Sequence, residues 1–499
     1  MYLYKVNNLI NIKYIWKGGN YMNFLENFIS VLNNYLWSYI LIALLITLGL
    51  FFSFKSKFVQ IRYFKEMFRL LGEGASKSGR EKHKGKKGVS SFQAFCISTA
   101  SRVGTGNLAG VAIAIASGGP GAVFWMWLIA LIGGASSFVE STLAQIYKVE
   151  DEHGFRGGPA YYMEKALNKK WMGIIFSILI TISYGLVFNS VQANTISLAF
   201  EQAFGVNTLI IGLILAVLTS LIIFGGVKRI ARVTEIIVPI MAITYVIVAL
   251  FVIFRNIGSI PSIFSLIIEN AFGIKQVVGG GLGAAVLMGI KRGLFSNEAG
   301  MGSAPNAAAT ANVTHPAKQG LIQTLGVFTD TILICSATSF IVLISGSYLK
   351  SDLTGIQLTQ TALSSQVGSW GNTFIAICIF LFAFSSVIGN YYYGETNIEF
   401  LKGSRTSLFL YRICVIGMVI FGSIAKIQIV WDMADLFMGF MAIINLIAIT
   451  MLSKIAFAAL KDYDRQKKQG IEPVFYADSI EGLNNIECWP TREESEKLA

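Results

Sequence analysis

The chain has 499 residues, a formal net charge of +12, and a composition that is 54% hydrophobic and 14% charged. Soluble domains carry about 25% charged residues, so this composition excludes an ordinary soluble protein. The mean hydropathy is +0.61, and the apolar residues form repeated runs of roughly 20, the length of an α-helix that crosses a bilayer. These runs predict many spanning helices and exclude a β-barrel, which needs short alternating segments.

The polar residues exclude several function classes. The basic residues lie beside the apolar runs, where they set topology, so we expect a lipid bilayer as partner and no nucleic acid. His83, His153 and His315 lie in polar connections, and the five cysteines show no CxxC spacing. We therefore expect no enzyme, no cofactor and no metal site of the zinc type.

Eleven spanning helices are predicted from apolar windows bounded by charges or by glycine and proline. They begin near residues 36, 92, 121, 172, 207, 234, 278, 321, 371, 406 and 429. The polar leader before the first span is too long for a signal peptide, so we expect this span to be retained. The amphipathic stretches 260–272 and 354–363 are expected to lie along the outer surface.

Charge sets the predicted orientation. The loop between the first two spans holds eleven Lys and Arg residues against three Glu, which makes it cytoplasmic by the positive-inside rule. The N-terminus is then outside and the C-terminus cytoplasmic, in a bacterial-type inner (plasma) membrane. The charged tail after residue 460 is expected to be solvated and mobile.

The ten spans after the first divide into two groups of five, and the leading span of each group is interrupted. The interruptions are Gly-Thr-Gly-Asn at 104–107 and Phe-Ser-Asn-Glu-Ala-Gly at 295–300. An odd number of spans per group inverts the second group relative to the first. In membrane transporters built from inverted repeats, paired broken helices mark the binding site. The predicted fold class is an all-α membrane protein with 11 transmembrane helices, in which one extra helix precedes a 5+5 inverted repeat.

This organisation divides the chain into seven parts. They are a leader (1–34), an extra helix (35–54), a basic cytoplasmic loop (55–90), a first five-helix repeat (91–257), an extracellular connection (258–277), a second repeat (278–456) and a cytoplasmic tail (457–499).

The first break predicts a site for an amino acid and a cation. Each glycine lowers helix stability by roughly 1 kcal/mol relative to alanine, so Gly104 and Gly106 favour local unwinding beside Thr105 and Asn107. The freed N–H groups attract a carboxylate, and the freed carbonyls attract Na+ or an ammonium. Two alternatives are that the glycines only allow close helix packing, or that they form a dinucleotide fingerprint, which lacks its preceding strand.

The second break places Ser296, Asn297 and Glu298 at membrane depth, where an ionisable group indicates function. An ion pair of Glu298 with Lys291 or Arg292 is the structural alternative. Asn297 is the better candidate for a direct ligand.

Further candidates lie on the fourth and ninth spans, where neutral oxygens ligate Na+ or join helices. They are Phe188, Asn189, Gln192 and Asn194, then Ser385, Ser386 and Asn390. Asp330 and Glu140 are interpreted as packing or gating residues, and Arg102 as a cytoplasmic gate or a snorkelling side chain.

Three strings carry a resemblance to a known family. GGPGAVFWMW at 118–127 resembles the signature of the alanine or glycine:cation symporters, also called sodium:alanine symporters. SRVGTGN at 101–107 and GLFSNEAGMGSAP at 293–305 resemble the family's two broken-helix motifs. The similarity runs from about residue 90 to residue 460.

The resemblance implies a LeuT-type fold and Na+-driven uptake of a small neutral amino acid by alternating access. It implies a substrate cradle of Gly104, Thr105, Gly106, Asn107, Gln192 and Asn297. Phe188 and Asn390 are predicted as further substrate-binding residues. Asn107 is expected near both ion and substrate. The wider fold implies a second Na+ between carbonyls of the first break and the hydroxyls of Ser385 and Ser386.

At Asn390, members of the family often carry a tryptophan that faces the substrate. A smaller polar residue predicts tolerance of a polar side chain, so the expected substrates are alanine, glycine, and also serine or glutamine. The alternatives left open are a proton-coupled transporter, with Glu298 or Asp330 as carrier, and a channel or non-transporting sensor on the same scaffold.

Overall fold

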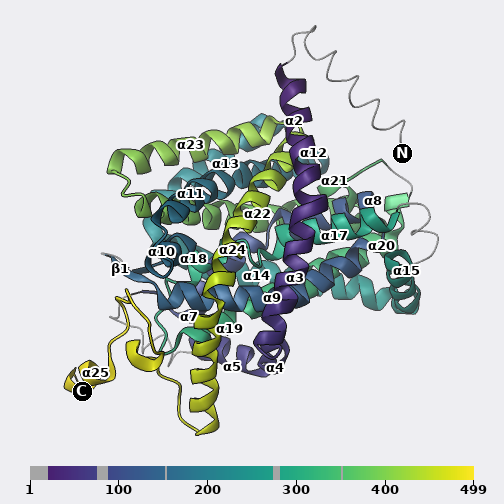
Figure 1. Ribbon diagram of the computed structural model, residues 1–499. Helices are drawn as coiled ribbons and strands as arrows, with labels where there is room; N and C mark the ends of the chain where they lie inside the picture. Colours follow the sequence, from purple (N-terminus) through teal and green to yellow (C-terminus); the bar gives the residue numbers. More distant parts are fainter. Residues whose placement is uncertain (1–20, 76–87, 152–153, 273–280, 350–351, 499) are drawn as a thin grey trace, which may run out of the picture.

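A computed structural model describes residues 21–75, 88–151, 154–272, 281–349 and 352–498. Helices form almost all of it (Figure 1), in agreement with the predicted all-α class. Within the described residues, eight helices are long and apolar enough to cross a membrane. Many large apolar side chains on them are exposed, such as Ile243 and Phe254, as expected for surfaces that face lipid.

The N-terminal third begins with a helix that starts well before the predicted position. Its parts are α2 (Tyr21–Tyr35), the π-helix η2 (Leu36–Leu41) and α3 (Ile42–Lys55). The Asn33 amide donates to the carbonyl of Asp432 at 2.8 Å, which joins α2 to the last long helix. The basic connection that follows holds two further helices, α4 (Val59–Arg62) and α5 (Phe64–Ala75).

The next elements carry the first break. They are α7 (Ser91–Arg102), the π-helix η3 (Gly106–Gly110), α8 (Val111–Gly118), α9 (Ala122–Ile146), strands β1 (Val149–Asp151) and β2 (Gly154–Arg156), α10 (Pro159–Lys165), α11 (Lys170–Ile180), the π-helix η4 (Thr181–Phe188), α12 (Asn189–Phe204), α13 (Thr208–Ile223) and α14 (Gly226–Arg255). The strands pair antiparallel, with Glu150 opposite Phe155.

The second half carries the second break. Its elements are η5 (Ile257–Ser259), α15 (Ile260–Phe272), α17 (Gly281–Asn297), α18 (Ala304–Ala308), α19 (Pro316–Val327), the π-helix η6 (Phe328–Cys335), α20 (Ser336–Ser345), η7 (Ser347–Leu349), α21 (Gly355–Val367), α22 (Trp370–Phe400), α23 (Arg405–Ile424), α24 (Ile427–Lys468), η8 (Ala477–Ser479) and α25 (Arg492–Leu498). The long α24 lies against the α2–α3 helix (Figure 1).

The C-terminal tail corrects an expectation. It was predicted to be solvated and mobile, yet Phe475 and Trp489 are buried. The Trp489 indole donates to the carbonyl of Gln145 at 3.0 Å, and the Phe475 amide donates to the carbonyl of Thr314 at 2.8 Å. Apolar side chains spaced along a charged tail are enough to fix it to the folded body. We call the face that it covers the tail side.

Candidate functional site

The first break interrupts a helix whose residues 94–112 are all buried. Helix α7 ends at Arg102, and Val103 leaves helical geometry at φ −81° and ψ 88°. The amide of Gly104 donates to Oδ1 of Asn107 at 2.9 Å, and the amide of Thr105 donates to Oε1 of Gln192 at 3.1 Å. Side-chain oxygens therefore satisfy the N–H groups that the break releases.

Gly104 has no room for a side chain. A Cβ at this position would lie 2.3 Å from Oγ of Ser386 and 2.8 Å from Oε1 of Gln192. At Gly106, a Cβ would lie 3.1 Å from the Cα of Ser296. The glycines therefore bring the first break directly against α22, α12 and the second break.

The second break is a run of left-handed residues between α17 and α18. Glu298, Gly300 and Gly302 have φ values of +57°, +85° and +83°. The amides of Gly300 and Gly302 donate to the Glu140 carboxylate, both at 3.1 Å. Asn445 completes this arrangement by donating to Glu140 at 2.8 Å. Glu140 therefore holds the released backbone in place, which fits its interpretation as a packing residue.

Glu298 does not pair with Lys291 or Arg292, so the ion pair considered for it is wrong. Its carboxylate accepts from Ser101 at 2.9 Å and from Ser303 at 2.6 Å. The contact with Ser101 at the end of α7 shows that the Glu298 side chain points toward the first break.

A buried cluster joins the two breaks through Asp330, which lies in the π-helix η6. Asn107 donates to Asp330 at 2.6 Å, and Ser296 donates at 2.7 Å. Thr331 donates to the same carboxylate at 2.9 Å, and Asn107 also donates to Ser296 at 3.0 Å. From the sequence alone, Asp330 is interpreted as a packing or gating residue, with proton carrier as an alternative. Its charge inside an apolar run was the signal that pointed to this site.

Oxygen atoms also converge between α7 and α22. Oγ of Ser386 lies 2.8 Å from the carbonyl oxygen of Ala100, 3.5 Å from that of Val103 and 3.0 Å from that of Phe382. Oγ of Ser385 lies 2.8 Å from the same oxygen of Phe382. Each hydroxyl proton forms one good hydrogen bond. The two serine hydroxyls therefore cannot bond all three carbonyl oxygens at the same time.

The remaining predicted residues surround the breaks. Oδ1 of Asn390 lies 2.8 Å from Oγ of Ser101, whose one proton it shares with Glu298, and Asn390 donates to Asn189 at 3.2 Å. Asn297 caps the second break by accepting from the Ala299 amide at 3.0 Å. Its Nδ2, like Oγ1 of Thr105, is buried and has no hydrogen-bond partner within the described part of the chain.

Two predicted residues lie elsewhere or differ from their interpretation. Asn194 donates to the carbonyls of Gly422 and Ala425, so it joins helices rather than facing the breaks. Arg102 does not snorkel, because it is 2% exposed and donates to the carbonyl of Gln323 at 3.2 Å. Its gating role stays a prediction.

Aromatic rings cover the breaks on the side opposite the tail. The ring of Phe188 packs on that of Phe295 with centroids 4.8 Å apart, and Phe295 packs on Trp431 at the same separation. Farther from the tail side, Lys291 and Arg292 each form an ion pair with Asp435 at 2.7 Å. Sequence reasoning missed Asp435, because no local spacing links it to residues more than a hundred positions away.

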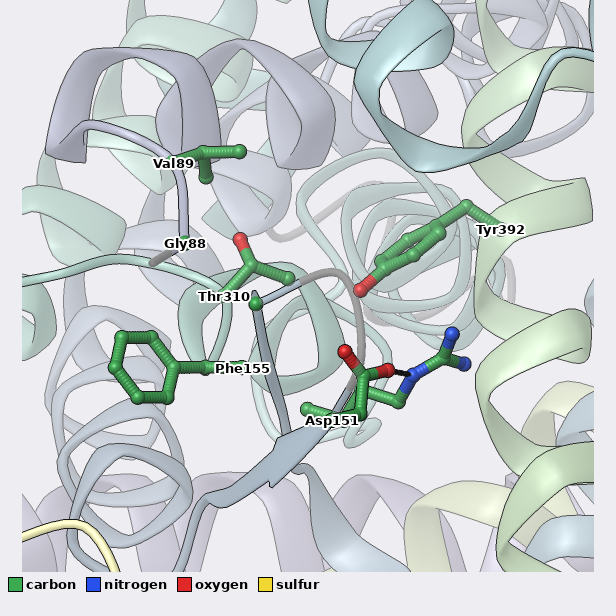
Figure 2. Close-up of a pocket in the computed structure, with 8 residues that line it drawn as sticks. Gly88, Val89, Asp151, Phe155, Thr310 and Tyr392 are labelled. Carbon is green, nitrogen blue, oxygen red and sulfur yellow. Dashed lines mark hydrogen bonds and ion pairs between the residues drawn. The ribbon is translucent and has the colours of Figure 1, made fainter. Parts of the chain in front are cut away.

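On the tail side, backbone pairing covers the breaks. Val89 and Ala311 form a parallel β-bridge between the chain that enters α7 and the chain that leaves α18. Figure 2 shows a pocket beside one bridge residue, Val89, with Gly88, Asp151, Phe155 and Thr310 around it. The pocket between them measures about 20 Å³, space for a single water molecule. The breaks are thus closed on both sides.

Comparison with known proteins identifies the family. The chain is 61% identical over 94% of its length to a probable sodium/glutamine symporter, GlnT, of Bacillus subtilis, covering 97% of that protein. It is 59% identical over 95% of its length to the amino-acid carrier protein AlsT of the same organism, covering 99%. It is 38% identical over 88% of its length to the sodium/alanine symporter AgcS of Methanococcus maripaludis, covering 97%.

The family model for sodium:alanine symporters matches residues 22–477. This family consists of transporters rather than enzymes. The match confirms the resemblance of the three sequence strings and the prediction of amino-acid symport through a multi-pass membrane protein. The chain belongs to the sodium:alanine symporter family.

Proposed function

We propose that the protein is a sodium-coupled symporter that imports small neutral amino acids by alternating access, with alanine, glycine, serine and glutamine as substrates. The observation that carries this proposal is the meeting of two broken helices at a cluster of buried oxygens and amides around Asn107. The name of the 61% identical relative supports glutamine within the substrate range.

The amino acid would bind at the first break. Its carboxylate would take the N–H groups of Gly104 and Thr105, which now donate to the amide oxygens of Asn107 and Gln192. A zwitterion therefore replaces existing hydrogen bonds rather than leaving buried donors unpaired. Phe188 and Phe295 would enclose the substrate, and Asn390 and Asn297 would face a polar side chain.

Two oxygen clusters would hold cations. The first cluster offers five neutral oxygens, which suit a hard cation. They are the hydroxyls of Ser385 and Ser386 and the carbonyls of Ala100, Val103 and Phe382. The second cluster is Asp330 with Asn107 and Ser296, so ion binding replaces the earlier interpretation of Asp330 as a packing or gating residue.

Charge supports cation coupling. Glu140, Glu298 and Asp330 lie buried near the breaks with Arg102 as the neighbouring cation, so acidic groups outnumber basic ones. Uncompensated charge at membrane depth is costly, and bound Na+ offsets it. Inward Na+ movement then provides about 2.3 kcal/mol per charge for each 100 mV of membrane potential.

We further propose eleven spans in a 5+5 inverted repeat. Residues 91–257 and 278–456 form the repeats, and the connection 258–277 lies outside. The tail side, with the loop 55–90 and the segment 457–499, would be cytoplasmic, and the N-terminus would be outside.

The test is uptake of labelled alanine and glutamine into proteoliposomes with an imposed Na+ gradient. We expect accumulation that stops when K+ replaces Na+ and that is lost in Asn107→Ala, while Asn256→Ala in a peripheral connection behaves as wild type. Accumulation driven by a pH gradient without Na+ would establish proton coupling instead. Equilibration without accumulation would establish a channel.

A further inference from the structure

A large apolar groove lies outside the two breaks, between helices that include α7 and η6. Its volume is about 1050 Å³, at the upper end of the range for small-molecule sites. Its walls come from α4, α5, α7, α14 and η6, with one residue each from α9 and α19, and its described lining contains no charged side chain. The groove reaches Cys96 of α7, which is completely buried, and Leu333, three residues beyond Asp330. It therefore extends from the tail side to the depth of the breaks.

We propose that this groove binds an acyl chain of an anionic phospholipid from the leaflet on the tail side. Large side chains at its edge, including Phe64, Phe68 and Ile243, are 45%, 54% and 59% exposed. Exposed apolar atoms at membrane depth face hydrocarbon, so a lipid chain fits the opening. The long, uncharged interior matches a chain rather than a polar solute.

Charge at the rim identifies the head group. Lys65 directly follows Phe64 on α5 and is exposed. Arg232, also exposed, lies on α14 two helical turns before Pro239 of the lining, on the same helix face and about 10 Å toward the tail side. We place the phosphate of a chain-bound lipid beside these two cations, and each basic residue near such a surface contributes about 1 kcal/mol to binding anionic lipid.

Two helices of the groove, α5 and α7, connect to different parts of the molecule. Helix α5 is fixed to the end of α24, because Glu66 accepts from Tyr463 at 2.6 Å and Lys467 lies 3.1 Å from it. Helix α7 leads into the first break. A lipid chain between them would hold α7 against a fixed support.

The test measures lipid binding alone, so it stands or fails independently of the transport proposal. Purified protein in nanodiscs of equal parts phosphatidylglycerol and phosphatidylcholine is labelled with phosphatidylglycerol that carries a photoactivatable diazirine in its acyl chain, and the labelled peptides are mapped by mass spectrometry. We expect labelling concentrated on α5, α7 and α14.

Variants that fill the groove from opposite walls should remove this labelling. Ala242→Trp and Leu333→Trp are each expected to lower it about tenfold, which corresponds to about 1.4 kcal/mol of binding free energy. Ile240→Trp, on a lipid-facing part of α14 outside the groove, is the matched control and should label as wild type. Folding is checked by the melting temperature of each variant.

The head group is tested separately with a phosphatidylcholine probe that carries the same chain. We expect wild type to prefer the phosphatidylglycerol probe and the combined Lys65→Ala and Arg232→Ala variant to lose this preference. Labelling spread evenly over all lipid-facing helices, or unchanged in both filled variants, would overturn the chain site. Equal labelling of wild type by both probes would overturn the anionic head group.

Discussion

Ser386 is the side chain on which the neutral cation site depends most. Its hydroxyl oxygen lies within 3.5 Å of three carbonyl oxygens from two different helices. A cation placed among these oxygens would be bound by all of them together, whereas a hydroxyl proton serves one at a time.

Ser386→Ala removes one oxygen and leaves the carbonyls in place. We expect the Na+ concentration for half-maximal uptake to rise about tenfold, equivalent to about 1.4 kcal/mol of lost binding. The amino-acid concentration dependence at saturating Na+ should change little. Ser339→Ala, which removes another buried helical hydroxyl, is the control. An unchanged Na+ dependence would place the ion elsewhere.

Gly104→Ala tests the closeness of the first break to its neighbours. The added Cβ would meet Ser386 and Gln192 at distances below any real contact, so we expect loss of amino-acid binding in a folded protein. Binding by calorimetry checks this. Gly417→Ala, where a Cβ meets nothing within 4 Å, should bind normally and gain roughly 0.5–1 kcal/mol of stability. Normal binding by the Gly104 variant would contradict the proposed cradle.

At the scale of elements, both breaks could be predicted because glycines and polar residues interrupt apolar runs. The partners that complete the site could not. The partners of three site residues are far away in the sequence, and neither periodicity nor local spacing predicts such contacts. These residues are Glu140, Asp435 and Ser101. The sequence shows Asp330 as an ionisable residue at membrane depth. The orientation of its side chain toward Asn107 depends on the π-helix in which it lies.

The C-terminal tail packs on Lys148, which follows α9. The Lys148 ammonium donates to Gln145 at 2.9 Å and to the carbonyl of Ala311 at 3.0 Å, and it faces the rings of Phe155 and Trp489. Burial lowers the pKa of Lys148 to about 7 from 10.5, opposed by the nearby Cys488. The tail therefore covers a lysine whose protonated, charged form is disfavoured by burial.

Removal of the tail exposes Lys148 and raises its pKa from about 7 toward the ordinary value of 10.5, so above pH 7 the uncovered residue binds a proton that the covered one does not. Docking of the tail should therefore strengthen as pH rises through this window and weaken as pH falls toward 7. Trp489 fluorescence from pH 6.5 to 9.5 measures docking, in a background where the other tryptophans are phenylalanine. Lys148→Met should abolish the pH dependence. A pH dependence that survives this substitution would assign it to another group.

At the scale of the whole molecule, the two breaks are closed from both sides. Aromatic rings and the Lys291–Arg292–Asp435 ion pairs cover one side, and the Val89–Ala311 bridge covers the other. Alternating access requires each closure to open in turn while the other stays shut.

A disulfide between Val89→Cys and Ala311→Cys should lock the tail side. Strands in a β-bridge lie about 4.8 Å apart, within the range that a disulfide spans. In a background with Cys414 and Cys488 replaced by serine, we expect oxidation to stop uptake and reduction to restore it. Each single variant is the control. Full uptake by the oxidised pair would show that this bridge does not open during transport.

The central claim is that Na+ and the amino acid bind together between the two breaks. Calorimetric titration of the purified protein with alanine and glutamine, in Na+ and in K+ at equal ionic strength, tests it most directly. We predict that Na+ lowers Kd at least about tenfold in wild type, and that Asp330→Asn reduces this coupling while the exposed Glu201→Gln does not. Equal Kd values in Na+ and K+ would contradict the account.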